Sequence, residues 1–200
     1  MSAPRGPYAK TSAKREQILR AALEIYAEAG SRKVSVRDIA KRVGMTDTGV
    51  LHHFGSREAL LTAVLEARDE ISAEMYGSAL TDPPAGAKML ADNVSTPGLV
   101  KLFLDVAAAA AEPEHPAHDF FAERYARFRR EGAAALADPV LAPDPDPGPG
   151  PGRIDSEWAA RILIAALDGL QIQWLLEPEI DMAADLAALH RTLLAALRSP

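Results

Sequence analysis

The stretch "VSVRDIAKRVGMTDTGVLHHFGSREALL", residues Val34–Leu61, contains two short amphipathic patterns that are separated by one glycine. Ser35 and Asp38 have the spacing of a capping box, in which the two side chains satisfy the free N–H groups of a helix start. Apolar residues then recur with the period of a helix that buries one face. Gly44 follows, and glycine tolerates the positive φ of a sharp turn. The stretch therefore predicts a short helix that ends in a turn.

A second short helix is predicted directly after this turn. Thr46 is a good N-cap for it, and the pattern runs to about His53. Val50 and Phe54 are expected to face inward. In a helix-turn-helix the second helix lies in the major groove of DNA, so it is short and its outer face takes no part in the core. The patterns therefore predict a helix-turn-helix over about residues 34–53.

The composition excludes several classes of protein. The chain has 200 residues, 48% of them apolar, which is enough for one or two compact domains. It has no cysteine, so disulfides and thiolate metal sites are excluded. No apolar run of secretory length occurs at the N-terminus, and the longest apolar run, at 102–111, contains Asp105 and is too short for a bilayer. We therefore expect a cytoplasmic protein that does not cross a membrane.

Charge is distributed unevenly along the chain. Residues 1–57 carry 11 Lys and Arg against 5 Asp and Glu, whereas residues 58–200 carry 11 against 23, which together give the net charge of −6. A basic part joined to an acidic part indicates that one end meets a polyanion. Chance clustering on a solvated surface is the alternative, since charge asymmetry alone is a loose indicator.

The rest of the chain is predicted to be all-α, because no convincing alternation of apolar and polar residues occurs. We expect a flexible basic arm at 1–10, a helix-turn-helix DNA-binding domain at 11–57, and a helical ligand-binding and dimerisation domain at 58–200. A Pro/Gly/Asp-rich loop is expected at 138–153. The predicted helices outside the motif are 11–29, 56 to about 76, 89–94, 97–111, 117–137, 154–176 and 182–197.

The segment "REQILRAALEIYAEAGSRKVSVRDIAKRVGMTDTGVLHHFGSREALLTAVL", Arg15–Leu65, closely resembles the N-terminal DNA-binding domain of the TetR family of bacterial transcriptional regulators. The features that match are IL-x-AA, S-V-R-D-I-A, the glycine turn, HHF and S-R-E-A-L-L. Two later segments, at 95–129 and 168–181, look like segments of one subgroup. The family often has Tyr where this chain has Leu51, which cannot bond a phosphate but could contact a thymine methyl group.

The resemblance implies a homodimeric repressor that a small-molecule effector releases from a palindromic operator in double-stranded DNA. It also implies that the acidic part binds the effector and forms the dimer. The open alternatives are a regulator without a small ligand, controlled by a protein partner, and an activator. No catalytic constellation supports an enzyme, and we expect neither a cofactor nor a metal site.

Residues in and around the motif are the candidates for DNA contact. The second helix should present a solvent-facing surface to base edges, and Gly49 would allow close approach of the backbone. His53 and Arg57 match phosphate-contacting positions of the family, and Lys10 and Lys14 are candidates for arm contacts. The predicted DNA-binding residues are Ser35, Arg37, Thr46, Asp47, Thr48, Gly49, Leu51, His52, His53 and Arg57.

Aromatic and polar residues of the acidic part are the candidates for effector contact, although an aromatic stripe is more often plain core. The predicted lining is Met89, Phe103, Phe121, Tyr125, Phe128, Trp158, Gln171 and Trp174. Four further residues are candidate polar handles, namely Asp105, His115, His118 and Asp168. The two histidines could equally satisfy loop carbonyls, and Asp168 could belong to an exposed polar stripe.

The last two helices are predicted to pair with those of a second copy in a four-helix bundle. The predicted interface residues are Leu186, Leu189, Leu193 and Leu197. The alternative is that these helices only complete the core of one chain.

Overall fold

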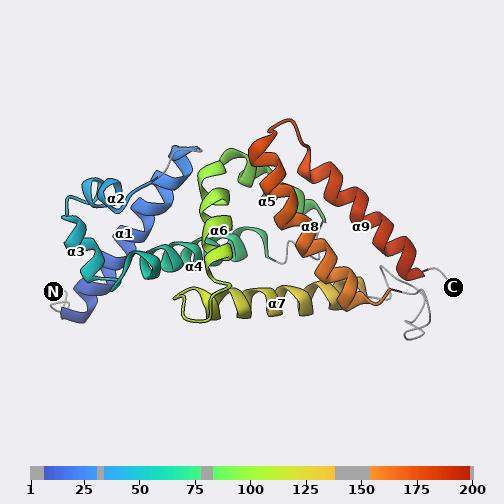
Figure 1. Ribbon diagram of the computed structural model, residues 1–200, viewed down its shortest axis with the longest axis horizontal. Helices are drawn as coiled ribbons and strands as arrows, with labels where there is room; N and C mark the ends of the chain where they lie inside the picture. The colour runs from blue at the N-terminus through green and yellow to red at the C-terminus, as the bar shows by residue number, and fades with distance from the viewer. Residues whose placement is uncertain (1–6, 31–33, 78–82, 138–153, 199–200) are drawn as a thin grey trace, which may run out of the picture. The chain divides into compact units, whose positions relative to one another are not determined.

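The computed structural model describes residues 7–30, 34–77, 83–137 and 154–198 (Figure 1). Every regular element in these ranges is an α-helix, as predicted. The helices are α1 (Pro7–Ala29), α2 (Val36–Arg42), α3 (Asp47–His52), α4 (Arg57–Tyr76), α5 (Pro83–Ser95), α6 (Pro97–Ala109), α7 (His118–Leu136), α8 (Ser156–Leu176) and α9 (Met182–Arg198).

Two helices begin earlier than the sequence predicts, and both begin at a proline. Helix α1 starts at Pro7, so residues 7–10 are helical rather than part of a flexible arm, and residues 1–6 lie outside the described ranges. Helix α5 starts at Pro83 instead of at residue 89. Proline suits a first helical position because its φ is already helical and its missing N–H would have had no partner there. The predicted loop at 138–153 lies outside the described residues.

The chain divides into two compact units, which differ from the predicted division at residue 57. The first unit contains Met1–Ile71 and Ser95–Phe120, and the second contains Ser72–Val94 and Phe121–Pro200. Helix α6 therefore groups with the helix-turn-helix, and α4 contributes residues to both units. The functional division that the sequence suggested stays a prediction.

The helix-turn-helix has the local geometry that the sequence predicts. The Ser35 side chain accepts a hydrogen bond from the Asp38 N–H, and the Asp38 carboxylate accepts one from the Ser35 N–H at 2.9 Å. Gly44 has a φ of 64°, so a side chain at this position would be strained. Ile39 of α2 and Val50 of α3 are buried with Ile18 of α1. The apolar faces of three helices thus form one small core.

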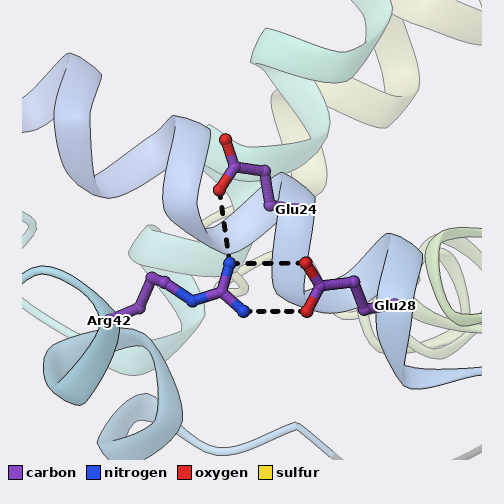
Figure 2. A network of polar contacts seen from close by, with 3 residues as sticks. All are labelled: Glu24, Glu28 and Arg42. Atoms are coloured by element: carbon purple, nitrogen blue, oxygen red, sulfur yellow. Dashed lines mark hydrogen bonds and ion pairs between the residues drawn. The ribbon is translucent and has the colours of Figure 1, made fainter.

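An ion-pair network on the surface holds α2 against α1 (Figure 2). The Arg42 guanidinium of α2 lies 3.3 Å from the Glu24 carboxylate and 2.8 Å from that of Glu28, both on α1. The two carboxylates raise the pKa of Arg42 above its ordinary value, with Glu28 having the larger effect. Arg42 is therefore already neutralised within the chain, although it belongs to the basic segment.

Helices α1 and α6 cross at very short range in the first unit. Gly98 lies near the start of α6, where a Cβ atom would collide with the carbonyl oxygen of Tyr26 and lie 2.8 Å from that of Gly30. Both neighbours are backbone atoms, which cannot rotate away as a side chain can. Only glycine allows this crossing.

The second unit has its own core, which α7, α8 and α9 build. Ala133 and Leu136 of α7 pack with Ala159 and Ala160 of α8 and with Leu193 of α9. Helices α8 and α9 are neighbours in the sequence and pack against each other (Figure 1). By length and composition alone, α8 is the one described helix that could cross a membrane, a weak indication because core helices pass the same test.

We expect Gly98→Ala to destabilise the protein by about 1–3 kcal/mol, because the new methyl group overpacks a contact between backbones. Gly169→Ala is the matched control, since a Cβ atom there meets nothing within 4 Å. It should stabilise helix α8 by about 0.5–1 kcal/mol. Urea unfolding of both variants measures the difference, and a Gly98→Ala variant as stable as the wild type would contradict this account of the crossing.

Candidate nucleic-acid interface and ligand sites

Helix α3 presents a polar surface to solvent. Val50 is its buried residue, whereas Asp47, Thr48 and His52 are exposed. Leu51 is half-buried, so it is less free than the sequence suggests. The outer side chains have no structural task in the described contacts, as a surface that reads base edges requires.

The start of α3 is fixed by a side-chain cap. The Thr46 hydroxyl accepts a hydrogen bond from the Gly49 N–H at 3.1 Å. A Cβ atom at Gly49 would lie 3.1 Å from that hydroxyl oxygen and 3.3 Å from the methyl group of Met45. Glycine at this position therefore serves the cap as well as any approach to DNA.

The end of α3 is fixed by Arg15 of α1, which sequence reasoning missed. The Arg15 guanidinium donates a hydrogen bond to the carbonyl oxygen of His53 and lies 4.2 Å from the centre of the Phe54 ring. A cation over an aromatic face is attracted by the ring quadrupole. Because 38 residues separate Arg15 from His53, no spacing rule could have found this contact.

The remaining predicted DNA-binding residues lie on the first unit, around the motif. Ser35 and Arg37 are exposed at the start of α2, where Ser35 also serves as the cap. The Arg57 side chain is 47% exposed and lies 3.9 Å from the Glu58 carboxylate. His53 is half-buried, and the centre of its ring lies 6.2 Å from the centre of the His52 ring. The side chain of Lys10 is outside the description, and Lys14 donates a hydrogen bond to Gln17.

The aromatic residues predicted to line an effector cavity are spread over the chain. Phe103 belongs to the first unit, where it is buried in α6. Phe121 and Trp174 are buried in the second unit, and Trp158 is 37% exposed. The guanidinium groups of two arginines lie over the ring of Phe128. Neither of the two hollows described in this structure is lined by any of these residues, and their lining role stays a prediction.

Tyr125 and Asp168 form a half-buried polar pair between α7 and α8. The Tyr125 hydroxyl donates a hydrogen bond to the Asp168 carboxylate at 2.7 Å. Burial raises the pKa of Asp168 above its ordinary value, against the opposing effects of the Tyr125 hydrogen bond and the Arg124 charge. Burial and this bond also raise the pKa of Tyr125. Gln171, one turn further along α8, is buried and donates to the Leu167 carbonyl.

The other predicted polar handles lie in the first unit. His118 bonds the Ala110 carbonyl oxygen through Nδ1 at 2.9 Å, which is the loop-satisfying alternative that the sequence left open. His115 Nδ1 accepts a hydrogen bond from the Ala117 N–H. Asp105 is exposed and pairs with Lys101 at 2.6 Å. In the described part of the chain, no group of three His, Asp or Glu side chains could hold a metal ion.

One hollow lies within the second unit, between α5, α8 and α9. Its volume is about 150 Å³, and apolar side chains line most of it, among them Met89, Leu90, Leu163 and Leu167. His190 of α9 is its one ionisable lining residue, and burial lowers the pKa of that imidazole. Of the residues predicted to line an effector cavity, Met89 lines this hollow.

The leucines predicted to form the dimer interface face the chain's own core. Leu193 is 5% exposed in the cluster of α7, α8 and α9, while Leu189 and Leu197 pack against that cluster. Leu186 lines the hollow of the second unit. Leu186, Leu189 and Leu197 are only half-buried, and the role of the four leucines in a dimer interface stays a prediction.

We expect His190 to make stability depend on pH. Its folded-state pKa lies below the unfolded value of about 6.5, so the unfolded state binds more protons as the pH falls below that value. The contribution of neutral His190 to the unfolding free energy is therefore fully present above about pH 6.5. It is lost as the pH falls from there through the folded-state pKa. His190→Gln should lose less unfolding free energy between about pH 7.5 and about pH 5.5 than the wild type does.

Urea unfolding at both pH values measures this difference. His52→Gln is the matched control, because the His52 ring is exposed on α3. It should lose as much unfolding free energy as the wild type. Equal losses in the wild type and His190→Gln would contradict the assignment to His190.

Two family descriptions match the chain over most of its length. Residues 18–64 match bacterial regulatory proteins of the tetR family. Residues 86–199 match the C-terminal part of BetI-type transcriptional repressors. The first match covers the helix-turn-helix, and the second covers α6 to α9 with most of α5.

Individual relatives agree with this assignment. An uncharacterized HTH-type transcriptional regulator, YvdT of Bacillus subtilis (strain 168), is 36% identical over 73 residues, which are 34% of this chain and 38% of the relative. The chain thus spans well under half the length of the curated relatives it matches.

Two solved structures share the fold. A TetR transcriptional regulator from Rhodococcus sp. RHA1 has a TM-score of 0.59 at 18% identity, over 92% of this chain and 97% of that one. The regulator FadR from Bacillus subtilis, in complex with stearoyl-CoA, has a TM-score of 0.59 at 17% identity, over 90% and 98%. The motif geometry and the two family matches lead to one conclusion: the chain belongs to the TetR family of bacterial transcriptional regulators, with a C-terminal part of the BetI type.

Proposed function

We propose that this protein is a cytoplasmic, homodimeric repressor that binds a palindromic operator and is released from it by a small-molecule effector. The observation that carries the DNA-binding part is the exposed face of α3, where Asp47, Thr48 and His52 stand outside a buried core. Side chains in such a position are free to contact base edges in the major groove.

Phosphate contacts would come from the residues that flank this face. Arg37 is exposed on α2, and Arg57 is half-exposed at the start of α4. Cations that neutralise phosphates release counterions, so their contribution to affinity falls steeply with salt. Arg42 is not among them, because two glutamates of α1 already pair with it.

The dimer would form through the outer face of α8 rather than through the predicted leucines. Three large apolar side chains are exposed on α8, at 37% for Trp158, 50% for Ile172 and 78% for Leu176. Their spacing places them near one side of the helix. A two-fold axis along this face would pair α8 and α9 with their copies and bury these side chains.

The effector would enter the second unit, to which α7, α8 and α9 belong. Its hollow offers apolar walls and a single imidazole, and the Tyr125–Asp168 pair is a polar group between neighbouring helices. The fold relative FadR binds stearoyl-CoA, a ligand with a long apolar chain. An effector with an apolar chain fits such walls, and helix α4, shared by both units, would carry its effect to the motif.

One observation favours a regulator that has no small ligand. The hollow of the second unit has a volume of about 150 Å³, whereas pockets for drug-sized ligands usually have about 300–1,000 Å³. Control by a protein partner, or a role as an activator, would need no larger space. A melting temperature that does not change with fatty acids or their acyl-CoA esters would favour this alternative.

We expect selection from random double-stranded DNA to enrich a palindrome whose half-sites lie about one helical turn apart. On that DNA, Arg37→Ala should reduce the slope of log affinity against log salt by about 1, because one phosphate contact is lost. Arg130→Ala, an exposed arginine of α7, is the matched control and should keep the wild-type slope. Enrichment of no sequence, or equal slopes in both variants, would contradict the proposed interface.

We expect Ile172→Glu to convert the dimer to a monomer, because a carboxylate would be buried in an apolar interface without a partner. Ile71→Glu is the matched control, since Ile71 of α4 is 45% exposed and Ile172 is 50% exposed. Sedimentation equilibrium measures the masses. A dimeric Ile172→Glu protein would show that the interface lies elsewhere.

A further inference from the structure

A larger hollow lies within the first unit, between α1, α4 and α6. Its volume is about 570 Å³, in the usual range for small-molecule sites. The crossing of α1 and α6 at Gly98 forms part of its wall. No predicted effector residue except Asp105 and His115 lines it, and the proposed effector site in the second unit does not include it.

A tyrosine in this hollow has a hydroxyl group with no hydrogen-bond partner among the described residues. Tyr26 of α1 is 7% exposed, and its hydroxyl makes no hydrogen bond with the described residues. Every fully buried polar side-chain atom in the described part of the chain has a partner, so this hydroxyl is not sealed off and opens on the hollow. A largely buried tyrosine usually satisfies its O–H group. A ligand would provide the missing partner.

Charges of both signs surround this hydroxyl. Burial raises the pKa of Tyr26, while Arg57 of α4 and Asp105 of α6 act on it in opposite directions. Both charged residues line the hollow together with Tyr26. Lys101 and Glu58 add one further charge of each sign, so these four charges balance.

The hollow also has an apolar part. Leu61 of α4 and Leu102 and Val106 of α6 line it, and all three are buried. A ligand with an apolar side chain would bury that side chain against them, which is favourable in proportion to the area covered. The lining thus combines one apolar wall with two positive and two negative groups, in which Arg57 lies 3.9 Å from the Glu58 carboxylate and Lys101 lies 2.6 Å from that of Asp105.

We propose that this hollow binds a small zwitterion with an apolar side chain, of the kind that a free hydrophobic amino acid represents. The ligand carboxylate accepts hydrogen bonds from the Arg57 guanidinium and the Tyr26 hydroxyl. The ligand ammonium donates to the Asp105 carboxylate. That carboxylate already accepts from Lys101, but its two oxygens have room for a further donor.

A ligand with only one charge fits this lining less well. A simple anion would meet the carboxylates of Glu58 and Asp105, and a simple cation would meet Arg57 and Lys101. A like charge at short range costs free energy where solvent is partly excluded. A zwitterion can place its carboxylate near the positive side chains and its ammonium near the negative ones, so neither of its charges has to face a like charge.

Occupation of the hollow would affect DNA binding through Arg57, if the proposed function holds. Arg57 is both a lining residue and a candidate phosphate contact, so a bound carboxylate and a DNA phosphate would compete for one guanidinium. By linkage, the ligand would weaken DNA binding by the factor by which DNA weakens ligand binding. The binding test below uses no DNA, so its failure is distinct from a failure of DNA recognition.

The test is isothermal titration calorimetry of the full chain with two probes, L-phenylalanine and L-leucine. Each has two analogues that lack one charge: 3-phenylpropanoate and phenethylamine for the first, 4-methylpentanoate and isoamylamine for the second. We expect at least one amino acid to bind, and both of its analogues to bind at least about tenfold more weakly, since each loses a charge-assisted hydrogen bond. No binding of either amino acid, or equal binding of an analogue, would overturn the proposal.

Two variants locate the binding. Tyr26→Phe should weaken amino-acid binding about tenfold, whereas Tyr76→Phe, which removes a hydroxyl bonded to Asp92 in the second unit, should leave it unchanged. Asp105→Asn should remove the preference for the amino acid over its carboxylate-only analogue. Asp105 is exposed, so this variant is expected to fold. Wild-type affinity and preference in both variants would place the ligand elsewhere and overturn the assignment.

Discussion

The crossing of α1 and α6 at Gly98 is the contact on which the first unit depends. Helix α1 carries the helix-turn-helix on one side, and α6 lies against its C-terminal carbonyl groups without a side chain between them. This contact cannot be adjusted by rotation of a side chain, because the atoms on both sides belong to the backbone. A displacement of α6 along this contact therefore moves α1 with it. The close crossing explains how α6 can belong to the motif's unit although 23 residues, 72–94, separate it from the rest of that unit in the sequence.

Helix α3 is fixed at its two ends and on its inner face, whereas its outer face is exposed to solvent. Thr46 caps its start, Val50 anchors its inner face, and Arg15 holds the chain at its end through the carbonyl oxygen of His53. These contacts use the Thr46 hydroxyl, the Val50 side chain and a backbone carbonyl group, and none of them involves the side chains of Asp47, Thr48 or His52. The outer residues can therefore change without loss of the fold. Under the proposed function, specificity and stability would reside on different atoms of one short helix.

The fold and the exposed face of α3 were largely predictable from local signals, whereas the contacts between distant parts of the chain were not. The capping box at Ser35, the cap at Thr46 and the turn at Gly44 are fixed by neighbouring residues, so the motif and the exposed face of α3 follow from short spacings. Arg15 acts on a residue 38 positions away, which no periodicity encodes. The period of the α9 leucines identifies a buried face but not its partner, and Leu193 lies in the core of its own chain. The spacing of apolar residues along a helix predicts which of its faces is buried. Which element buries that face depends on tertiary contacts that the spacing does not encode.

The discontinuity of the first unit has a consequence for how the chain folds. Its residues come from 1–71 and 95–120, with all of α5 except Ser95 between them. On a ribosome, the helix-turn-helix emerges well before α6, and until then the face of α1 that Gly98 later covers remains in water. Closing a long intervening loop costs entropy that grows slowly with its length, and the contact that repays it comes last. Completion of the first unit is thus tied to synthesis of residues 95–120, well beyond the motif.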